Sequence, residues 1–259
     1  MSSYYDEITK SLIELLEVLR KLRGPGGCEW DKEQTSKTLI PYLLEETYEV
    51  IESINEENDE GLKEELGDLT LHILFQSEIA KERKKFDFSD SLKEAAKKLI
   101  ARHPHIFHQG TSKENNQTWE QLKQKEKNRN SILDGVPKNL PGLLRARRVQ
   151  EKAANVGFDW KILQPVLDKL DEEIKELKEA ILKNNHNNIK DELGDTFFSL
   201  VNLSRFLKIN PEEAIKSTIS KFEKRFMKVE NEIEKAGKSI SDATLDEMDA
   251  IWNRIKKEE

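Results

Sequence analysis

Two pairs of carboxylates in the second half of the chain carry the clearest chemical signal. Glu173 and Glu176 stand three residues apart in a helical pattern, and Glu192 and Asp195 repeat that spacing in the next pattern. Residues at i and i+3 share a helix face, so an antiparallel hairpin would bring all four together. A divalent cation would relieve their repulsion and their desolvation cost. Ligation by oxygen alone suits Mg²⁺, with Mn²⁺ as a possible substitute.

A solvated helix face is the plain alternative, because Glu-x-x-Glu pairs arise often among 50 acidic residues. Gly194 argues for a site, since glycine inside a helix costs roughly 1 kcal/mol against alanine. It suggests either close helix approach or access for a ligand, although a helix-packing glycine without a ligand role stays open. A di-iron centre is disfavoured, because no Glu-x-x-His pair occurs at these positions.

The first half of the chain repeats the acidic motifs. The segment 45–49 resembles 172–176, and Glu-Leu-Gly-Asp occurs at both 65–68 and 192–195. The interval from Glu49 to Glu65 equals that from Glu176 to Glu192. We therefore predict a duplicated module of about 120 residues, longer than the repeat of a solenoid. Its first copy offers a second set of metal ligands: Glu46, Glu49, Glu65 and Asp68.

Apolar residues recur at helical spacing through most of the chain, and few segments alternate with period two. The sequence therefore predicts an all-α fold, built as two tandem helical-bundle domains over residues 1–128 and 143–259. The segment 129–142 is rich in turn-forming residues and is the predicted linker. The predicted helices cover residues 8–22, 38–54, 60–82, 91–101, 119–127, 143–154, 166–183, 188–207, 211–236 and 245–257.

Composition excludes several classes of protein. The net charge of −7 argues against nucleic acid as a partner. No apolar stretch approaches the ~18 residues of a membrane span, and the N-terminus has no secretory signal, so we expect a cytoplasmic protein. Cys28 is the one cysteine, which excludes an internal disulfide and a zinc ribbon. The glycines at 24–27 lack the Gly-Lys-Ser/Thr ending of a P-loop, which disfavours a kinase or GTPase.

Further motifs make the chain resemble a known family. They are Gly-Cys-Glu-Trp-Asp-Lys-Glu-Gln-Thr at 27–35, Arg-His-Pro-His-Ile-Phe at 102–107, Asn-Val-Gly-Phe-Asp-Trp at 155–160 and Lys-Phe-Glu-Lys-Arg-Phe at 221–226. Together with the acidic repeat, they resemble the MazG nucleoside triphosphate pyrophosphohydrolases over nearly the whole chain. The resemblance implies an all-α homodimer that hydrolyses nucleoside triphosphates to the monophosphate and pyrophosphate with Mg²⁺.

The resemblance also implies roles for individual residues. Metal ligation would fall on Glu173, Glu176, Glu192 and Asp195, with activity usually credited to this C-terminal copy. From the residues themselves, we predict catalytic roles for Glu172, Glu173, Lys221 and Arg225. The residues expected to contact substrate are Lys169, Leu170, Asp171, Glu172, Glu173, Asn188, Ile189, Lys190, Asp191, Asp195, Lys221, Phe222, Glu223, Lys224, Arg225 and Trp252.

The hypothesis for the reaction is hydrolysis assisted by Mg²⁺. A carboxylate, Glu172 or Glu173, accepts the proton of the attacking water, and Lys221 and Arg225, one turn apart, neutralise the departing pyrophosphate. A regulatory or interaction protein that binds nucleotide or metal without turnover is the alternative. Trp252 is a candidate for stacking on a base, although tryptophan in a small helical domain is more often part of the core. For the histidines at 103, 105 and 108, two roles stay open: they could order a loop, or they could bind a metal ion.

Overall fold

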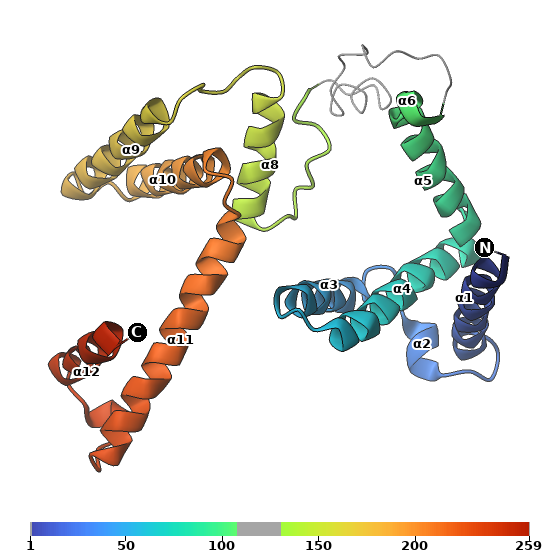
Figure 1. Ribbon diagram of the computed structural model, residues 1–259, viewed down its shortest axis with the longest axis horizontal. Helices are drawn as coiled ribbons and strands as arrows, with labels where there is room; N and C mark the ends of the chain where they lie inside the picture. The colour runs from blue at the N-terminus through green and yellow to red at the C-terminus, as the bar shows by residue number, and fades with distance from the viewer. Residues whose placement is uncertain (1, 108–130, 259) are drawn as a thin grey trace. The chain divides into compact units, whose positions relative to one another are not determined.

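The computed structural model describes residues 2–107 and 131–258, and all regular structure in these ranges is helical (Figure 1). The all-α prediction is confirmed. The chain divides into two compact units, residues 1–114 (unit 1) and 115–259 (unit 2). The predicted helix at 119–127 and His108 lie outside the described residues, and the domain bounds at 128 and 143 stay a prediction. No described helix has both the length and the apolar character needed to cross a membrane.

Unit 1 is organised around a hairpin of two helices. Its described helices are α1 (Ser2–Arg23), α2 (Glu29–Glu33), α3 (Ile40–Asn55), α4 (Asp59–Glu82), α5 (Phe88–Arg102) and α6 (Pro104–Phe107). The helices α3 and α4 pack along each other, and α1 packs against α4. Leu19, Leu39 and Leu74, all fully buried, join Phe75 and Ile79 in the core.

Unit 2 contains a second hairpin of the same kind. Its described elements are α8 (Gly142–Ala154), α9 (Gln164–Leu182), α10 (His186–Phe206), α11 (Pro211–Lys235), the 3₁₀ turn η1 (Ile240–Asp242) and α12 (Leu245–Glu258). The helices α9 and α10 pack along each other, and α8 packs against α10. The last helix, α12, folds back against the C-terminal part of α11 (Figure 1). Val229, Ile233 and Ile255 form the core between these last two helices.

Both hairpins turn by the same local device. Glu57 and Asn184 have positive φ angles of 54° and 51°, so the chain leaves each first helix through a left-handed residue. The next residue, Asn58 or Asn185, caps the second helix: the side-chain oxygen of Asn58 accepts a hydrogen bond from the Gly61 backbone N–H, and that of Asn185 accepts one from Asn188. Because the turns are equivalent, the acidic motifs face each other in the same register in both units.

Candidate metal centre

Three carboxylates of unit 2 meet between α9 and α10. One oxygen each from Glu173, Glu192 and Asp195 lies within 4.8 Å of the other two. Glu173 comes from α9 and is only 5% exposed, whereas α10 supplies the other two. Partial burial raises the pKa of Glu192, and the negative charges of Glu176, Asp195 and Glu173 raise it further. The structure therefore gathers these three residues (the unit 2 carboxylates) and places Glu176 near enough to act on them.

Lys169 neutralises part of this charge. Its Nζ lies 2.8 Å from Glu173 Oε1 and 2.9 Å from Glu172 Oε1, one turn along α9. Hydrogen bonds to these two carboxylates, with Glu173 contributing more, hold the pKa of Lys169 above its ordinary value. A buried carboxylate is tolerated when a cation pairs with it, and Lys169 provides that cation for Glu173.

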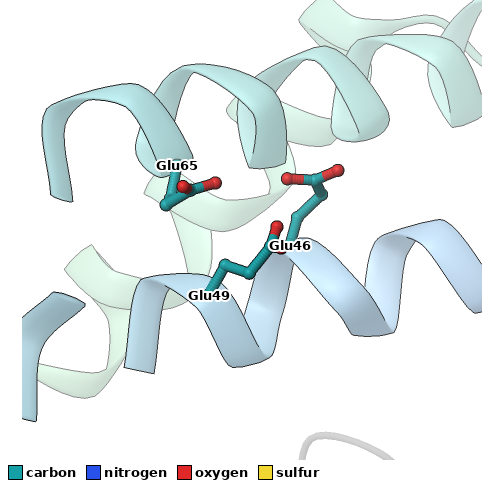
Figure 2. Close-up of side chains that lie close together, drawn as sticks. All are labelled: Glu46, Glu49 and Glu65. Atoms are coloured by element: carbon teal, nitrogen blue, oxygen red, sulfur yellow. The ribbon is translucent and has the colours of Figure 1, made fainter. Parts of the chain in front are cut away.

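Unit 1 also gathers three of its four predicted ligands, shown in Figure 2, but here Glu49 belongs to the group and Asp68, the counterpart of Asp195, does not. Oxygens of Glu46, Glu49 and Glu65 lie within 4.8 Å of one another, with Glu46 and Glu49 on α3 and Glu65 on α4 (the unit 1 carboxylates). Burial raises the pKa of Glu46 to about 7, and the charges of Asp68, Glu49 and Glu65 add to the rise. Glu65 also has a raised pKa, for which burial comes first and the charge of Glu49 second.

A histidine lies beside Glu46. His72 Nε2 lies 3.7 Å from Glu46 Oε1, but burial lowers the pKa of His72, so the ring is neutral at pH 7. The position that Lys169 occupies in unit 2 holds Tyr42 in unit 1, as the repeat of 46 in 173 shows. At this position, therefore, unit 1 has no lysine to match the one that pairs with Glu173 in unit 2.

The chemistry of both donor sets fits a hard divalent cation. Each set offers carboxylate oxygens alone, and oxygen ligands are those that Mg²⁺ and Mn²⁺ prefer. Burial first, and the neighbouring negative charges second, raise the pKa values of Glu46 and Glu192, and a bound cation would offset both effects. The residues fit the predicted ligands, and their role in ligation stays a prediction.

The glycines of the two motifs border open space. A Cβ built on Gly194 or on Gly67 would meet nothing within 4 Å. Close packing among the residues that the structure describes therefore does not require either glycine. The space beside the acidic pair is compatible with ligand access.

A cavity of about 650 Å³ opens beside the unit 2 carboxylates. It lies among α8, α9, α10 and the turn that follows α8, and Glu173 and Asp195 line it. Apolar side chains of Val149, Val166 and Phe198 form part of its wall. The cavity and the carboxylates thus form one continuous site.

The predicted phosphate-binding residues on α11 pack against α12. The Arg225 guanidinium carbon lies 4.8 Å from the centre of the Trp252 ring, and the rings of Phe222 and Trp252 are 5.1 Å apart. Trp252 also packs against the core formed by Val229 and Ile255. These contacts give Trp252 a structural role, and the roles of Lys221, Phe222, Glu223, Lys224, Arg225 and Trp252 toward substrate stay predictions.

The remaining predicted substrate contacts lie on the hairpin. Leu170 and Asp171 belong to α9, beside Lys169, and residues 188–191 lie in the first turns of α10. Sequence reasoning missed Gln150, Asn202 and Arg205, which line the cavity. Arg205 pairs with Asp159 at 2.6 Å, and Asp159 also lines the cavity.

Comparison with known proteins identifies the family. The model of the MazG nucleotide pyrophosphohydrolase domain matches residues 34–107 and again residues 163–229, one match in each unit. The chain is 44% identical over 245 residues to the nucleoside triphosphate pyrophosphohydrolase/pyrophosphatase MazG of Thermotoga maritima, which covers 94% of each chain.

Two further relatives extend the comparison. The nucleoside triphosphate pyrophosphohydrolase of Escherichia coli is 40% identical over 256 residues, 95% of this chain and 97% of the relative. The uncharacterised protein YabN of Bacillus subtilis is 42% identical over 248 residues, 93% of this chain and 51% of the relative. With two family matches and relatives aligned along nearly its full length, the chain belongs to the MazG family.

Proposed function

We propose that this protein is a Mg²⁺-dependent pyrophosphohydrolase that cleaves nucleoside triphosphates to the nucleoside monophosphate and pyrophosphate. The observation that carries the proposal is the meeting of the unit 2 carboxylates within 4.8 Å at the mouth of a cavity of about 650 Å³. The printed names of the relatives from Thermotoga maritima and Escherichia coli support the same reaction.

Glu173, Glu192 and Asp195 would hold the cation, and Glu176 lies close enough to contribute its charge. When bound, Mg²⁺ supplies positive charge for the triphosphate oxygens and lowers the pKa of water. Lys169 pairs with Glu173 at 2.8 Å and adds positive charge beside the carboxylates. The Glu172 side chain is 55% exposed and shares that lysine, so it is available to accept the proton of the attacking water.

We assign turnover to unit 2. Its carboxylates have a lysine beside them and a cavity next to them, whereas Tyr42 and His72 stand beside the unit 1 carboxylates. In this assignment Lys221 and Arg225 neutralise the departing pyrophosphate, and residues 1–128 and 143–259 act as the two domains. Exposed apolar side chains on α11, Phe222 and Met227, support association into a homodimer. The cytoplasmic location stays a prediction.

The reaction is tested with the full chain, a panel of ribo- and deoxyribonucleoside triphosphates, and Mg²⁺ or EDTA. Products are separated by anion exchange, and phosphate is measured with and without added inorganic pyrophosphatase. We expect monophosphate and pyrophosphate in equal amounts, only with Mg²⁺, and phosphate only after pyrophosphatase is added. Release of diphosphate, or nucleotide binding without turnover, would contradict the proposal, and the second result would favour the regulatory alternative.

A further inference from the structure

A turn in the segment before α8 contributes to the cavity of unit 2. The segment runs back along α8, with Ile132 beside Lys152 near the end of that helix and Pro141 at its N-cap (Figure 1). Leu133, in the same segment, lines the cavity together with residues of α8, α9 and α10. The sequence predicts a linker at 129–142, so the contribution to the cavity wall is an additional property of this part of the chain.

Hydrogen bonds within residues 131–134 (the strap) close this turn. Asp134 Oδ2 accepts from the Ser131 backbone N–H at 2.9 Å, and the Asp134 N–H donates to the Ser131 carbonyl at 3.1 Å. Ser131 Oγ also accepts from the Leu133 N–H at 3.1 Å. Because side-chain bonds of this kind hold a turn together, one attachment to α8 is enough to place Leu133.

A buried lysine provides that attachment. Lys152 on α8 is 4% exposed, and its Nζ donates a hydrogen bond to the Ile132 backbone carbonyl at 3.1 Å. Burial of an ammonium group is costly unless hydrogen bonds compensate for it. Among the described residues that line the cavity, Leu133 is present and Lys152 is not. The hydrogen bond to Ile132 therefore gives Lys152 a link to the cavity wall.

The repeat shows that a module of this kind can fold without a lysine at this position. Lys152 precedes Gly157 by the same interval as Leu22 precedes Gly27. Leu22 belongs to α1 and is 37% exposed. An aliphatic side chain thus serves at the equivalent position of unit 1. The bond to the strap therefore explains the ammonium group of unit 2 better than a need of the helix does.

We propose that the strap is a movable wall of the unit 2 cavity and that Lys152 is the positioning residue that holds it in place. While the hydrogen bond to Ile132 is formed, Leu133 adds apolar surface to the cavity. When that bond breaks, the cavity loses this wall. The effect on catalysis rests on the proposed function, because it requires a substrate in the cavity, whereas the attachment of the strap does not.

Lys152→Met keeps the length of the side chain and removes its donor. In the full chain, the backbone amides of residues 131–134 should exchange with deuterium about tenfold faster than in the wild type, as measured by mass spectrometry. KM for ATP with Mg²⁺ should rise by about three- to tenfold, since Leu133 no longer covers the substrate. The value of kcat should stay within about twofold of the wild type, because the loss is in binding alone.

Leu133→Ala separates the wall from its attachment. It removes the side chain at the cavity and keeps the bond to Lys152, so KM should rise as in Lys152→Met while exchange stays at the wild-type rate. Because both substitutions act through one contact, the double variant should have no higher KM than the weaker-binding single variant. A merely structural role of Lys152 would instead add the two effects on KM.

Lys183→Met is the matched control. It removes a lysine of the same unit that is 72% exposed and pairs with Glu179 at 3.8 Å, on α9 instead of the strap. Exchange at residues 131–134 and KM should both match the wild type. If the control changes them as much as Lys152→Met does, a general effect of lost positive charge replaces the proposal.

The outcomes keep the strap and the proposed function apart. Unchanged exchange in Lys152→Met would overturn the attachment, and faster exchange with unchanged KM would overturn the strap as a cavity wall. If Lys152→Met does not fold, as judged by circular dichroism, Asp134→Ala decides. It opens the exposed side of the turn and should raise both exchange and KM, whereas unchanged values would refute the strap. If no triphosphate is hydrolysed with Mg²⁺, the proposed function fails, and the exchange measurement alone decides on the attachment.

Discussion

Lys169 Nζ lies 2.8 Å from Oε1 of Glu173, and this ion pair distinguishes the two acidic centres of the chain. In unit 1 the equivalent glutamate, Glu46, faces a neutral His72 at 3.7 Å. The same acidic motif has thus acquired a fixed counter-charge in one unit and a raised pKa, about 7, in the other. The difference in charge predicts different behaviour toward cations and substrate.

Replacing Lys169 with methionine removes a cation beside the metal ligands. A divalent cation would then approach the unit 2 carboxylates with less repulsion, so Mn²⁺ should bind as tightly as in the wild type or tighter. The triphosphate would lose a positive group, so kcat/KM should fall by about 10- to 100-fold. Titration calorimetry with Mn²⁺ and initial rates with ATP measure the two effects.

Lys175→Met is the control for that substitution. Lys175 lies on the same helix, is 77% exposed, and pairs only loosely with Glu179 at 4.0 Å. Its removal should change neither quantity. Loss of Mn²⁺ binding in Lys169→Met would show that the lysine organises the site instead of adding charge to it.

Unit 1 should be less stable at alkaline pH when no metal is present. The pKa of Glu46 rises from 4.5 to about 7 on folding, so between these values the folded state binds more protons than the unfolded state. Stability therefore falls as the pH rises through this window. Glu46→Gln removes the effect and should raise the melting temperature in EDTA at pH 8 but not at pH 4.

Glu45→Gln, a neighbouring exposed glutamate, controls for the loss of a negative charge. Mg²⁺ at pH 8 should stabilise the wild type more than Glu46→Gln, because the cation relieves the same repulsion. A Glu46→Gln variant that melts at the wild-type temperature at pH 8 would contradict the cause assigned to the raised pKa.

Gly194→Ala should exchange activity for stability. A Cβ at this position meets nothing within 4 Å, so alanine should stabilise α10 by up to about 1 kcal/mol. If the open space admits substrate, the methyl group should lower kcat/KM. Gly67→Ala in unit 1 has the same open surroundings and should give the same gain in chemical denaturation without loss of activity. Equal activity in both variants would remove ligand access as the reason for Gly194.

The start of α12 depends on one glutamate. Glu247 accepts hydrogen bonds from the Thr244 backbone N–H at 2.7 Å and from Lys238 Nζ at 2.6 Å, while Thr244 Oγ1 accepts from the Glu247 N–H. Lys238 first, and then Thr244, lower the pKa of Glu247 to about 2. Its contribution is complete above the ordinary pKa of 4.5 and is lost as the pH falls toward 2.

Glu247→Gln should therefore melt below the wild type at pH 7, with the difference shrinking as the pH falls from 4.5 toward 2. Asp246→Asn, at the adjacent position of the first turn, tests whether any lost charge there has this effect. A difference in melting temperature that persists at pH 2 would point to lost packing instead of lost hydrogen bonds.

The hairpins could be predicted closely from the sequence. The pattern at 60–82 corresponds to α4 at Asp59–Glu82, and that at 166–183 to α9 at Gln164–Leu182. Apolar periodicity works there because one face packs against a partner helix. The helix predicted at 8–22 begins earlier, at Ser2. The sequence did not indicate this start because Tyr4 and Tyr5 are exposed and do not continue the helical spacing of the apolar residues that face the core. The five-residue α2 was missed because it is too short to show a period.

The carboxylate clusters could be anticipated from spacing, whereas the cavity could not. Carboxylates three apart on neighbouring helices converge in any hairpin of the right register. The cavity instead depends on side-chain volume at positions such as 199 and 202, on three helices and a turn. The repeat shows that Ser199 replaces His72, but only the packed structure shows that the smaller residue borders empty space.

The most direct test of the account is the rate of pyrophosphate release by Glu192→Gln with saturating Mg²⁺. The unit 2 carboxylates are held to bind the cation that the reaction needs, so the rate should fall by at least about a hundredfold, while Glu65→Gln in unit 1 should keep most of it. Glu179→Gln, which removes an exposed carboxylate paired with Lys175 and Lys183, should match the wild type. A Glu192→Gln variant that releases pyrophosphate at the wild-type rate would contradict the central claim.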